Sequence, residues 1–197
     1  MKRIVVTIVI LLFCASKLQA QKSITGIAMN SMVVDSSGIV HIPGAVISPI
    51  VPIGKSKYDV WGFVFVQKNY LEIVAGVARN IGNFGFGLAG GPEFVPGNTQ
   101  ARLAATVYYF RGKDYVYGYA ETYVNGSGLW YLLYYDRTVS DWFTVGPYIQ
   151  YESGIGGRLK LTIPKTPISL WGAIGHKGAV LGIELYLEKK NENKKAP

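Results

Sequence analysis

The sequence predicts an all-β fold, an antiparallel up-and-down transmembrane β-barrel of about ten strands, with twelve as the alternative. Three observations lead to this fold class. From Tyr58 onward, apolar and polar residues alternate in runs of about 8 to 12 residues, as in strands whose successive side chains point to opposite faces. Short turn segments separate the runs, and Asn125 and Gly126 are the strongest hairpin signal among them. Beyond the N-terminal leader, no stretch offers the roughly 20 consecutive apolar residues of a membrane-spanning helix.

Residues 1–20 predict a secretory signal peptide. Lys2 and Arg3 give this segment a positive start, and an apolar stretch follows over residues 4–13. The only cysteine of the chain, Cys14, lies inside the segment, so the mature protein is expected to form no disulfide. We therefore expect an exported protein.

The positive charge of the chain is concentrated at its two ends. The formal net charge is +8, but only 13 basic and 11 acidic residues lie between positions 21 and 188. Residues 189–197 form a lysine-rich tail. Basic and aromatic residues are not interleaved on any predicted face, so no nucleic-acid partner is expected.

The segment 21–57 allows two interpretations. It is apolar, but Pro43, Pro49 and Pro52 disfavour a central strand. It could supply two further strands near 23–34 and 39–48, which would raise the total to twelve. The alternative is a plug inside the barrel or a segment along its rim.

Ten strands are expected between residues 58 and 188, where the β-barrel proper is predicted. Each is an alternating run bounded by turn residues. The expected strands are 58–67, 70–80, 83–91, 101–111, 114–124, 129–138, 141–152, 155–164, 167–175 and 178–188. Only residues 92–99 predict a longer loop between two of them.

Each predicted strand has one aliphatic face and one face of small, polar or tyrosyl residues. In the last strand Leu181, Ile183 and Leu185 share a face, whereas Tyr115 and Tyr117 illustrate the other face in an earlier strand. A water-exposed surface usually carries many more charged residues than this second face does. We therefore expect the aliphatic face to contact lipid and the tyrosyl face to line the interior.

These features resemble the small outer-membrane β-barrel proteins of Gram-negative bacteria. The resemblance rests on the signal peptide, the alternation over residues 58–188, and the last strand, VLGIELYL. That strand places Gly182, Leu185 and Leu187 in register with the C-terminal assembly signal of the family, although Val180 replaces a polar residue and ten residues follow. The resemblance implies outer-membrane localisation with lipid as the surroundings, and termini in the periplasm. It brings no catalytic or binding residue.

Charged residues on the predicted interior face are the candidates for a functional site. Their side chains could form a polar path for a small solute, or a set of ion pairs that fills and rigidifies the barrel. The second interpretation is favoured because many tyrosines and tryptophans compete for the same space. The candidates are Glu72, Arg102, Glu121, Asp136, Glu152, Arg158, Lys160 and Glu184. Among them, Arg158 and Lys160 on one strand are expected to pair with Glu184 across one intervening strand. Glu152 precedes the strand of Arg158 and Lys160, so it is expected to complete an acid, base, acid series.

No enzymatic activity, metal site or cofactor is expected. His41 and His176 are the only histidines, and neither belongs to a recognisable arrangement of nucleophile, base and carboxylate or of metal ligands. The four tryptophans and many of the tyrosines are expected in belts at the membrane interfaces.

The sequence thus favours a non-enzymatic outer-membrane β-barrel with a structural or accessory role in the cell envelope, where it could contact other envelope proteins. Two alternatives stay open. One is a narrow channel for small solutes. The other is a secreted lipocalin-like barrel that binds a ligand with its aliphatic face turned inward. The sequence does not indicate an oligomeric state.

Overall fold

A computed structural model describes residues 24–30, 33–35, 38–40, 44–53 and 56–188 of the chain. The expected signal peptide, the tail 189–197 and His41 lie outside these residues. The described part is built from antiparallel strands joined by turns. No helix in it is long and apolar enough to cross a bilayer.

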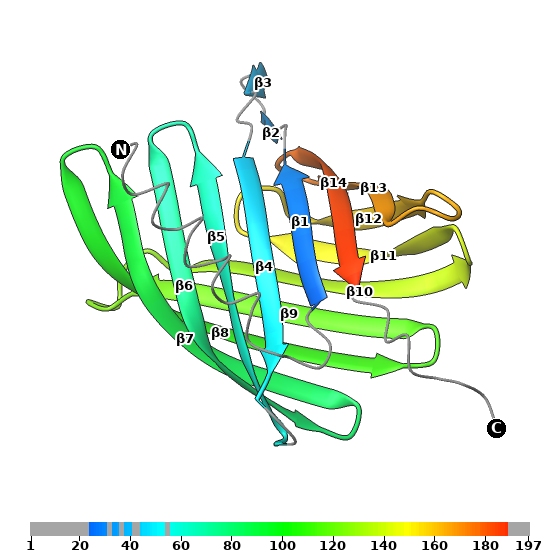
Figure 1. Ribbon diagram of the computed structural model, residues 1–197. Helices are drawn as coiled ribbons and strands as arrows, with labels where there is room; N and C mark the ends of the chain where they lie inside the picture. The colour runs from blue at the N-terminus through cyan, green and yellow to red at the C-terminus, as the bar shows by residue number, and fades with distance from the viewer. Residues whose placement is uncertain (1–23, 31–32, 36–37, 41–43, 54–55, 189–197) are drawn as a thin grey trace.

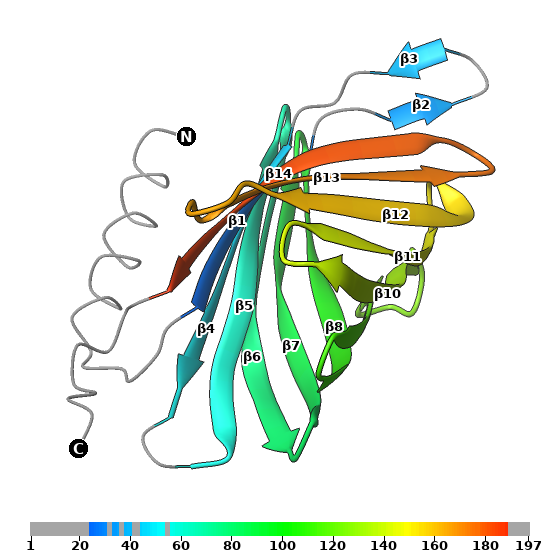
Figure 2. The ribbon, with the colours of Figure 1, turned by 90° about the vertical axis from the view of Figure 1, so that its right-hand side faces the viewer.

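Twelve of the described strands pair in a closed ring. β1 is hydrogen-bonded to β4 on one side and to β14 on the other, and β4 to β14 pair consecutively. The twelve strands are β1 (Ile24–Asn30), β4 (Gly44–Pro52), β5 (Tyr58–Gln67), β6 (Tyr70–Ile81), β7 (Phe84–Val95), β8 (Asn98–Arg111), β9 (Asp114–Tyr123), β10 (Trp130–Ser140), β11 (Phe143–Gln150), β12 (Gly154–Thr162), β13 (Ile168–Gly175) and β14 (Ala179–Glu188). Figures 1 and 2 show the curved sheet, with β1 between β4 and β14. The predicted fold class is confirmed, with the strand count of the twelve-strand alternative.

The barrel has two distinguishable ends. The start of β1 and the end of β14 pair at one end, where Ile24 lies opposite Glu188. We call this the terminal end. At the other end, β2 (Val33–Asp35) and β3 (Gly38–Val40) form a small hairpin that pairs with β14 through Val34 and Ala179 and projects beyond the barrel (Figure 1). We call this the hairpin end, and the turns 96–97, 124–129, 151–153 and 176–178 lie there.

Prolines interrupt the hydrogen-bond ladder without ending the strands. Pro49 lies inside β4, where pairing with β5 stops after Ile47 and resumes at Ile50. Pro92 lies inside β7 in the same way, opposite Ala101 on the β8 side but skipped on the β6 side. Proline has no N–H to donate, so only the ladder on one side of the strand is broken.

The predicted loop at residues 92–99 is therefore wrong. β7 continues to Val95 and β8 begins at Asn98, so only a two-residue turn remains. Gly97 supports this tight turn with a φ of +77°, a conformation that glycine adopts without strain.

The outer surface of the barrel is apolar, as the alternation predicted. Leu88, Ile155 and Ile174 expose 70%, 65% and 72% of their surface, and Ile183 is also exposed. Monomeric soluble proteins rarely expose apolar surface that is this extensive. Because the aliphatic face points outward, the structure does not have the inward-facing aliphatic wall of the lipocalin-like alternative.

The tryptophans depart from the expected interface belts. Trp142 is exposed in the turn between β10 and β11, but Trp61 is buried in a core cluster with Val74 and Tyr119 inside the ring. Trp130 and Trp171 also point inward, since both line the internal cavity described below. The belt prediction is wrong for these three, because an indole fits the lumen of a barrel as well as it fits a membrane interface.

Candidate functional site

A cavity of about 580 Å³ lies inside the ring of strands. Side chains from β4, β5, β6 and β8 to β14 line it, so it occupies the lumen between opposite walls. Its lining combines aromatic rings with charged groups. The charged residues that line it are Glu72, Arg102, Glu121, Glu152, Arg158 and Glu184.

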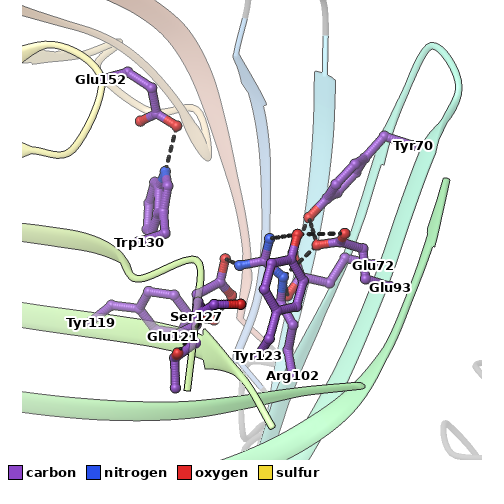
Figure 3. Close-up of polar contacts among 11 residues, drawn as sticks. Tyr70, Glu72, Glu93, Arg102, Tyr119, Glu121, Tyr123, Ser127, Trp130 and Glu152 are labelled. Carbon is purple, nitrogen blue, oxygen red and sulfur yellow. Dashed lines mark hydrogen bonds and ion pairs between the residues drawn. The ribbon is translucent and has the colours of Figure 1, made fainter. Parts of the chain in front are cut away.

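One charged group of the lumen is centred on Arg102 of β8, towards the hairpin end. Its Nη1 donates to Glu121 Oε1 at 2.8 Å, and its Nε donates to Glu93 Oε2. Glu72 Oε1 lies 3.9 Å from the same Nε. Figure 3 shows the three carboxylates converging on the guanidinium from β6, β7 and β9. We refer to Arg102, Glu72, Glu93 and Glu121 as the Arg102 cluster.

Tyrosines complete the hydrogen bonds of the Arg102 cluster. The Tyr70 hydroxyl lies 2.9 Å from oxygens of both Glu72 and Glu93, and the Tyr123 hydroxyl donates to Glu93 Oε1 at 3.0 Å. The guanidinium carbon of Arg102 also lies 4.4 Å from the centre of the Tyr123 ring. Such stacking adds a cation–π attraction to the ion pairs.

The Arg102 cluster is buried and carries more acid than base. Glu72 and Glu93 are directly opposite each other in the register of β6 and β7, a position where like charges repel. Each exposes only 2% of its surface, and Arg102 exposes 9%. Because buried carboxylates need a partner, Arg102 is the group that makes this arrangement tolerable.

A second charged group lies on the wall formed by β10 to β14. Arg158 of β12 donates to Asp136 through Nη1, and its Nη2 donates to Glu184 Oε1 at 3.0 Å. Lys160 Nζ lies 3.8 Å from Glu184 Oε2. The structure thus brings Arg158 and Lys160 together with Glu184 across β13, and it adds Asp136 on the other side. Here two bases face two acids.

Aromatic rings connect the two charged groups around the cavity. Tyr119 donates to Glu121 and packs against Trp130, with ring centres 5.7 Å apart. Trp130 Nε1 donates to Glu152 Oε1 at 2.6 Å, as the upper part of Figure 3 shows. Further along β10, the Tyr134 ring lies 4.4 Å from the Arg158 guanidinium carbon. The cavity therefore has aromatic walls with charged groups at their edges.

The structure places seven of the eight predicted site residues on lumen-facing strand positions. Glu152 is the exception, because β11 ends at Gln150 and Glu152 lies in the following turn. It nevertheless lines the cavity at the hairpin end. Its predicted position next to Arg158 in an acid, base, acid series is taken by Asp136 instead.

Glu93 is the main site residue that sequence reasoning missed. The sequence pattern predicts a loop at residues 92–99, so Glu93 is not assigned to the interior face of a strand. The alternation itself carried the signal, because in GGPEFV a strand places Glu93 on one face and Phe94 on the other.

The described residues contain no group of three or more histidine, cysteine, aspartate or glutamate side chains with metal-binding geometry. His176 lies in the turn between β13 and β14, where its Nδ1 accepts the backbone N–H of Ile155 at 3.0 Å. This contact ties the turn to β12, which is a structural role.

Comparison with known proteins relates the fold to porins. No family model and no curated protein matches the sequence. Among solved structures, a KdgM porin aligns with a TM-score of 0.57 and 15% identity, over 82% of this chain and 98% of the porin. KdgM porin in complex with disordered oligogalacturonate gives 0.54 and 14%, over 84% and 98%. A structure from work on the in-meso crystallization of membrane proteins gives 0.54 and 10%, over 85% and 84%.

Identities this low establish the architecture and not a shared activity. The alignments nevertheless cover nearly the whole of each porin and more than four fifths of this chain. The resemblance inferred from the sequence is confirmed at the level of fold: the described part of the chain is a small antiparallel β-barrel similar in fold to the KdgM porin structures.

Proposed function

We propose that this protein is a narrow channel for small solutes in the outer membrane. The observation that carries the proposal is the cavity of about 580 Å³ inside a ring of strands whose outer surface is apolar. An apolar exterior suits lipid, and a polar lumen provides a path for water and solutes. The similarity to porin structures favours the same function.

The structural or accessory role, which the sequence favoured, is the less well supported of the two. It rests on the ion pairs and tyrosines that occupy part of the lumen, and on contacts with other envelope proteins that remain a hypothesis. The side chains of these ion pairs line the cavity, which keeps a volume of about 580 Å³. They therefore narrow the channel and stiffen its wall without filling it.

One of the similar porin structures is a complex with oligogalacturonate, but we do not propose oligogalacturonate as the solute of this chain. Galacturonate units bear carboxylates, and the cavity described here is lined by four carboxylates and two guanidinium groups. Like charges in a low-dielectric lumen repel each other. The proposal therefore concerns a channel of this architecture with a different solute.

Single-channel recording tests the proposal. The refolded chain without residues 1–20 is inserted into a planar bilayer after a heat-dependent gel shift has confirmed folding. Discrete and reproducible current steps are expected. A folded and inserted barrel that never conducts would overturn the channel function and favour the accessory role.

A pair of matched variants tests whether the current passes through the lumen. Ser48 of β4 lines the cavity, so Ser48→Trp places an indole inside it and is expected to lower the conductance. Ile155→Trp introduces the same side chain on the exposed outer face and is expected to leave the conductance unchanged. Equal effects of the two variants would show that the current does not pass through this cavity.

A further inference from the structure

We propose that the channel admits cationic solutes, in particular organic ammonium ions, and discriminates against anions. This inference rests on the proposed channel function and adds the class of solute. Three features of the lumen lead to it: its net charge, the acid excess of the Arg102 cluster, and the aromatic wall between Glu121 and Glu152.

The cavity carries an excess of negative charge. Four carboxyl groups and two guanidinium groups line it, which gives a formal charge of −2 with all six groups ionised and −1 with Glu72 protonated. Three further charged residues form ion pairs with the groups that line the cavity: Glu93, Asp136 and Lys160. With every group ionised, they bring the formal charge of the combined set to −3. A cleft lined by one sign of charge within low-dielectric walls concentrates ions of the opposite sign.

The acid excess lies in the Arg102 cluster and at Glu152. Around Arg158 the charges balance, since Asp136 and Glu184 meet Arg158 and Lys160. In the Arg102 cluster a single guanidinium faces three carboxylates. Each ion pair there is already formed, so Arg102 has little attraction left for an anion in the cavity.

Glu72 provides an independent sign that the Arg102 cluster lacks positive charge. The residue is 98% buried and lines the cavity, and its Oε1 accepts no hydrogen bond from the described part of the chain. Arg102 Nε, the cationic atom paired with this oxygen, is 3.9 Å away. A buried carboxylate oxygen without a donor favours the approach of a cation or a donor from the lumen.

The wall between Glu121 and Glu152 suits an organic cation. Tyr119 donates to Glu121 through its hydroxyl, and Trp130 donates to Glu152 through its indole N–H. Both rings therefore hold a carboxylate at their edge, while both line the cavity. Aromatic faces attract ammonium groups, and tryptophan does so most strongly. The two rings pack against each other, so the two aromatic rings and the two carboxylates lie together along the cavity.

The first test is the reversal potential of the channel in a tenfold gradient of potassium chloride. We expect a potassium-to-chloride permeability ratio well above one, roughly tenfold. Glu152→Gln keeps an acceptor for Trp130 and is expected to lower the ratio roughly twofold, and Glu152→Lys roughly fourfold. Asp141→Asn removes the same charge from an exposed turn at the terminal end and is expected to change the ratio little.

The second test uses choline chloride as the probe. Choline is expected to reduce the potassium current at lower concentration than sodium does. Trp130→Leu is expected to raise the choline concentration that halves the current severalfold. Trp142→Leu, an identical change in the exposed turn between β10 and β11 and outside the lining of the cavity, serves as the matched control and is expected to have no effect.

The outcomes separate this inference from the proposed function. A conducting channel that prefers chloride, or whose ratio does not respond to Glu152→Lys, would overturn the cation selectivity and leave the channel intact. A channel that is cation-selective but indifferent to choline and to Trp130→Leu would overturn the ammonium preference. A folded barrel without conductance would overturn both the channel and this inference.

Discussion

Replacement of Arg102 by methionine is expected to destabilise the barrel strongly. Methionine has a similar length but no charge, so the three carboxylates of the Arg102 cluster would be left together in a site where Glu72 and Glu93 are 98% buried. Removal of one partner from a buried ion pair typically costs about 3–5 kcal/mol, because the other charge remains uncompensated. We expect the free energy of unfolding of Arg102→Met to fall by about this amount.

The ion pair of Arg137 and Asp114 is a control, because its N–O distance equals that of Arg102 and Glu121 but it is exposed to solvent. Arg102 Nη1 and Glu121 Oε1 are 2.8 Å apart, and so are Arg137 Nη1 and Asp114 Oδ1. The side chain of Arg137 is 56% exposed, however, against 10% for Arg102. Water and salt screen the exposed pair, so Arg137→Met is expected to have little effect on stability.

Arg102→Lys distinguishes charge from geometry. Lysine keeps the positive charge but presents one nitrogen, whereas Arg102 reaches Glu93 through Nε and Glu121 through Nη1. We therefore expect a stability between those of the wild type and Arg102→Met.

The assay is urea unfolding of the protein folded into lipid vesicles, followed by tryptophan fluorescence and by the heat-dependent gel shift. Equal destabilisation by Arg102→Met and Arg137→Met would refute the argument from burial. A wild-type stability of Arg102→Met would show that the three carboxylates do not depend on Arg102.

Three further predictions concern the outer face, the packing of the lumen and the orientation. Leu88→Lys places a charge on the lipid face of β7 and is expected to cost about 2–4 kcal/mol if Leu88 lies near the bilayer midplane, measured as the folded fraction in vesicles. Gly87→Val is expected to destabilise by about 1–3 kcal/mol in urea unfolding, because an added Cβ would lie 2.4 Å from the Trp61 indole nitrogen. Lys177→Cys is expected to react with an impermeant maleimide on intact cells, because its turn lies at the hairpin end, away from termini that we propose to be periplasmic.

Matched variants accompany these three predictions. Leu88→Ala keeps the outer face apolar, and a loss as large as that of Leu88→Lys would contradict a lipid-facing position. Gly157→Val adds the same side chain where the nearest atom is 4.0 Å from the added Cβ, and an equal effect would refute the packing argument. Lys113→Cys lies in a turn at the terminal end, and its labelling in place of Lys177→Cys would reverse the orientation.

The strands between residues 58 and 188 could be predicted mostly to within two residues, and the largest exceptions lie around Pro92. The expected strand 70–80 corresponds to β6 (Tyr70–Ile81), whereas the expected strand 83–91 falls four residues short of the end of β7 at Val95. Proline lowers strand propensity wherever it occurs, but its cost depends on whether its missing N–H faces a partner. That dependence is a property of the assembled sheet.

The candidate site was predictable in its composition and only partly in its arrangement. Alternation predicted Glu72, Arg102 and Glu121 on the inner face, and in the structure the three are buried and line the cavity. Alternation could not show that all three meet with Glu93. That contact depends on the register of β6 to β9, which pairs Glu72 with Glu93 and sets Arg102 within reach of both neighbouring strands.

The sequence by itself determined the strands and their two faces, because successive side chains of a strand point to opposite sides whatever the strand packs against. Only the tertiary structure decided that segment 21–57 contributes β1 and β4 to the wall, that Trp61, Trp130 and Trp171 lie inside, and that a cavity remains between the charged groups. These properties depend on how many strands close the ring and on their register. Both are set by contacts between residues far apart in the chain, which local patterns do not encode.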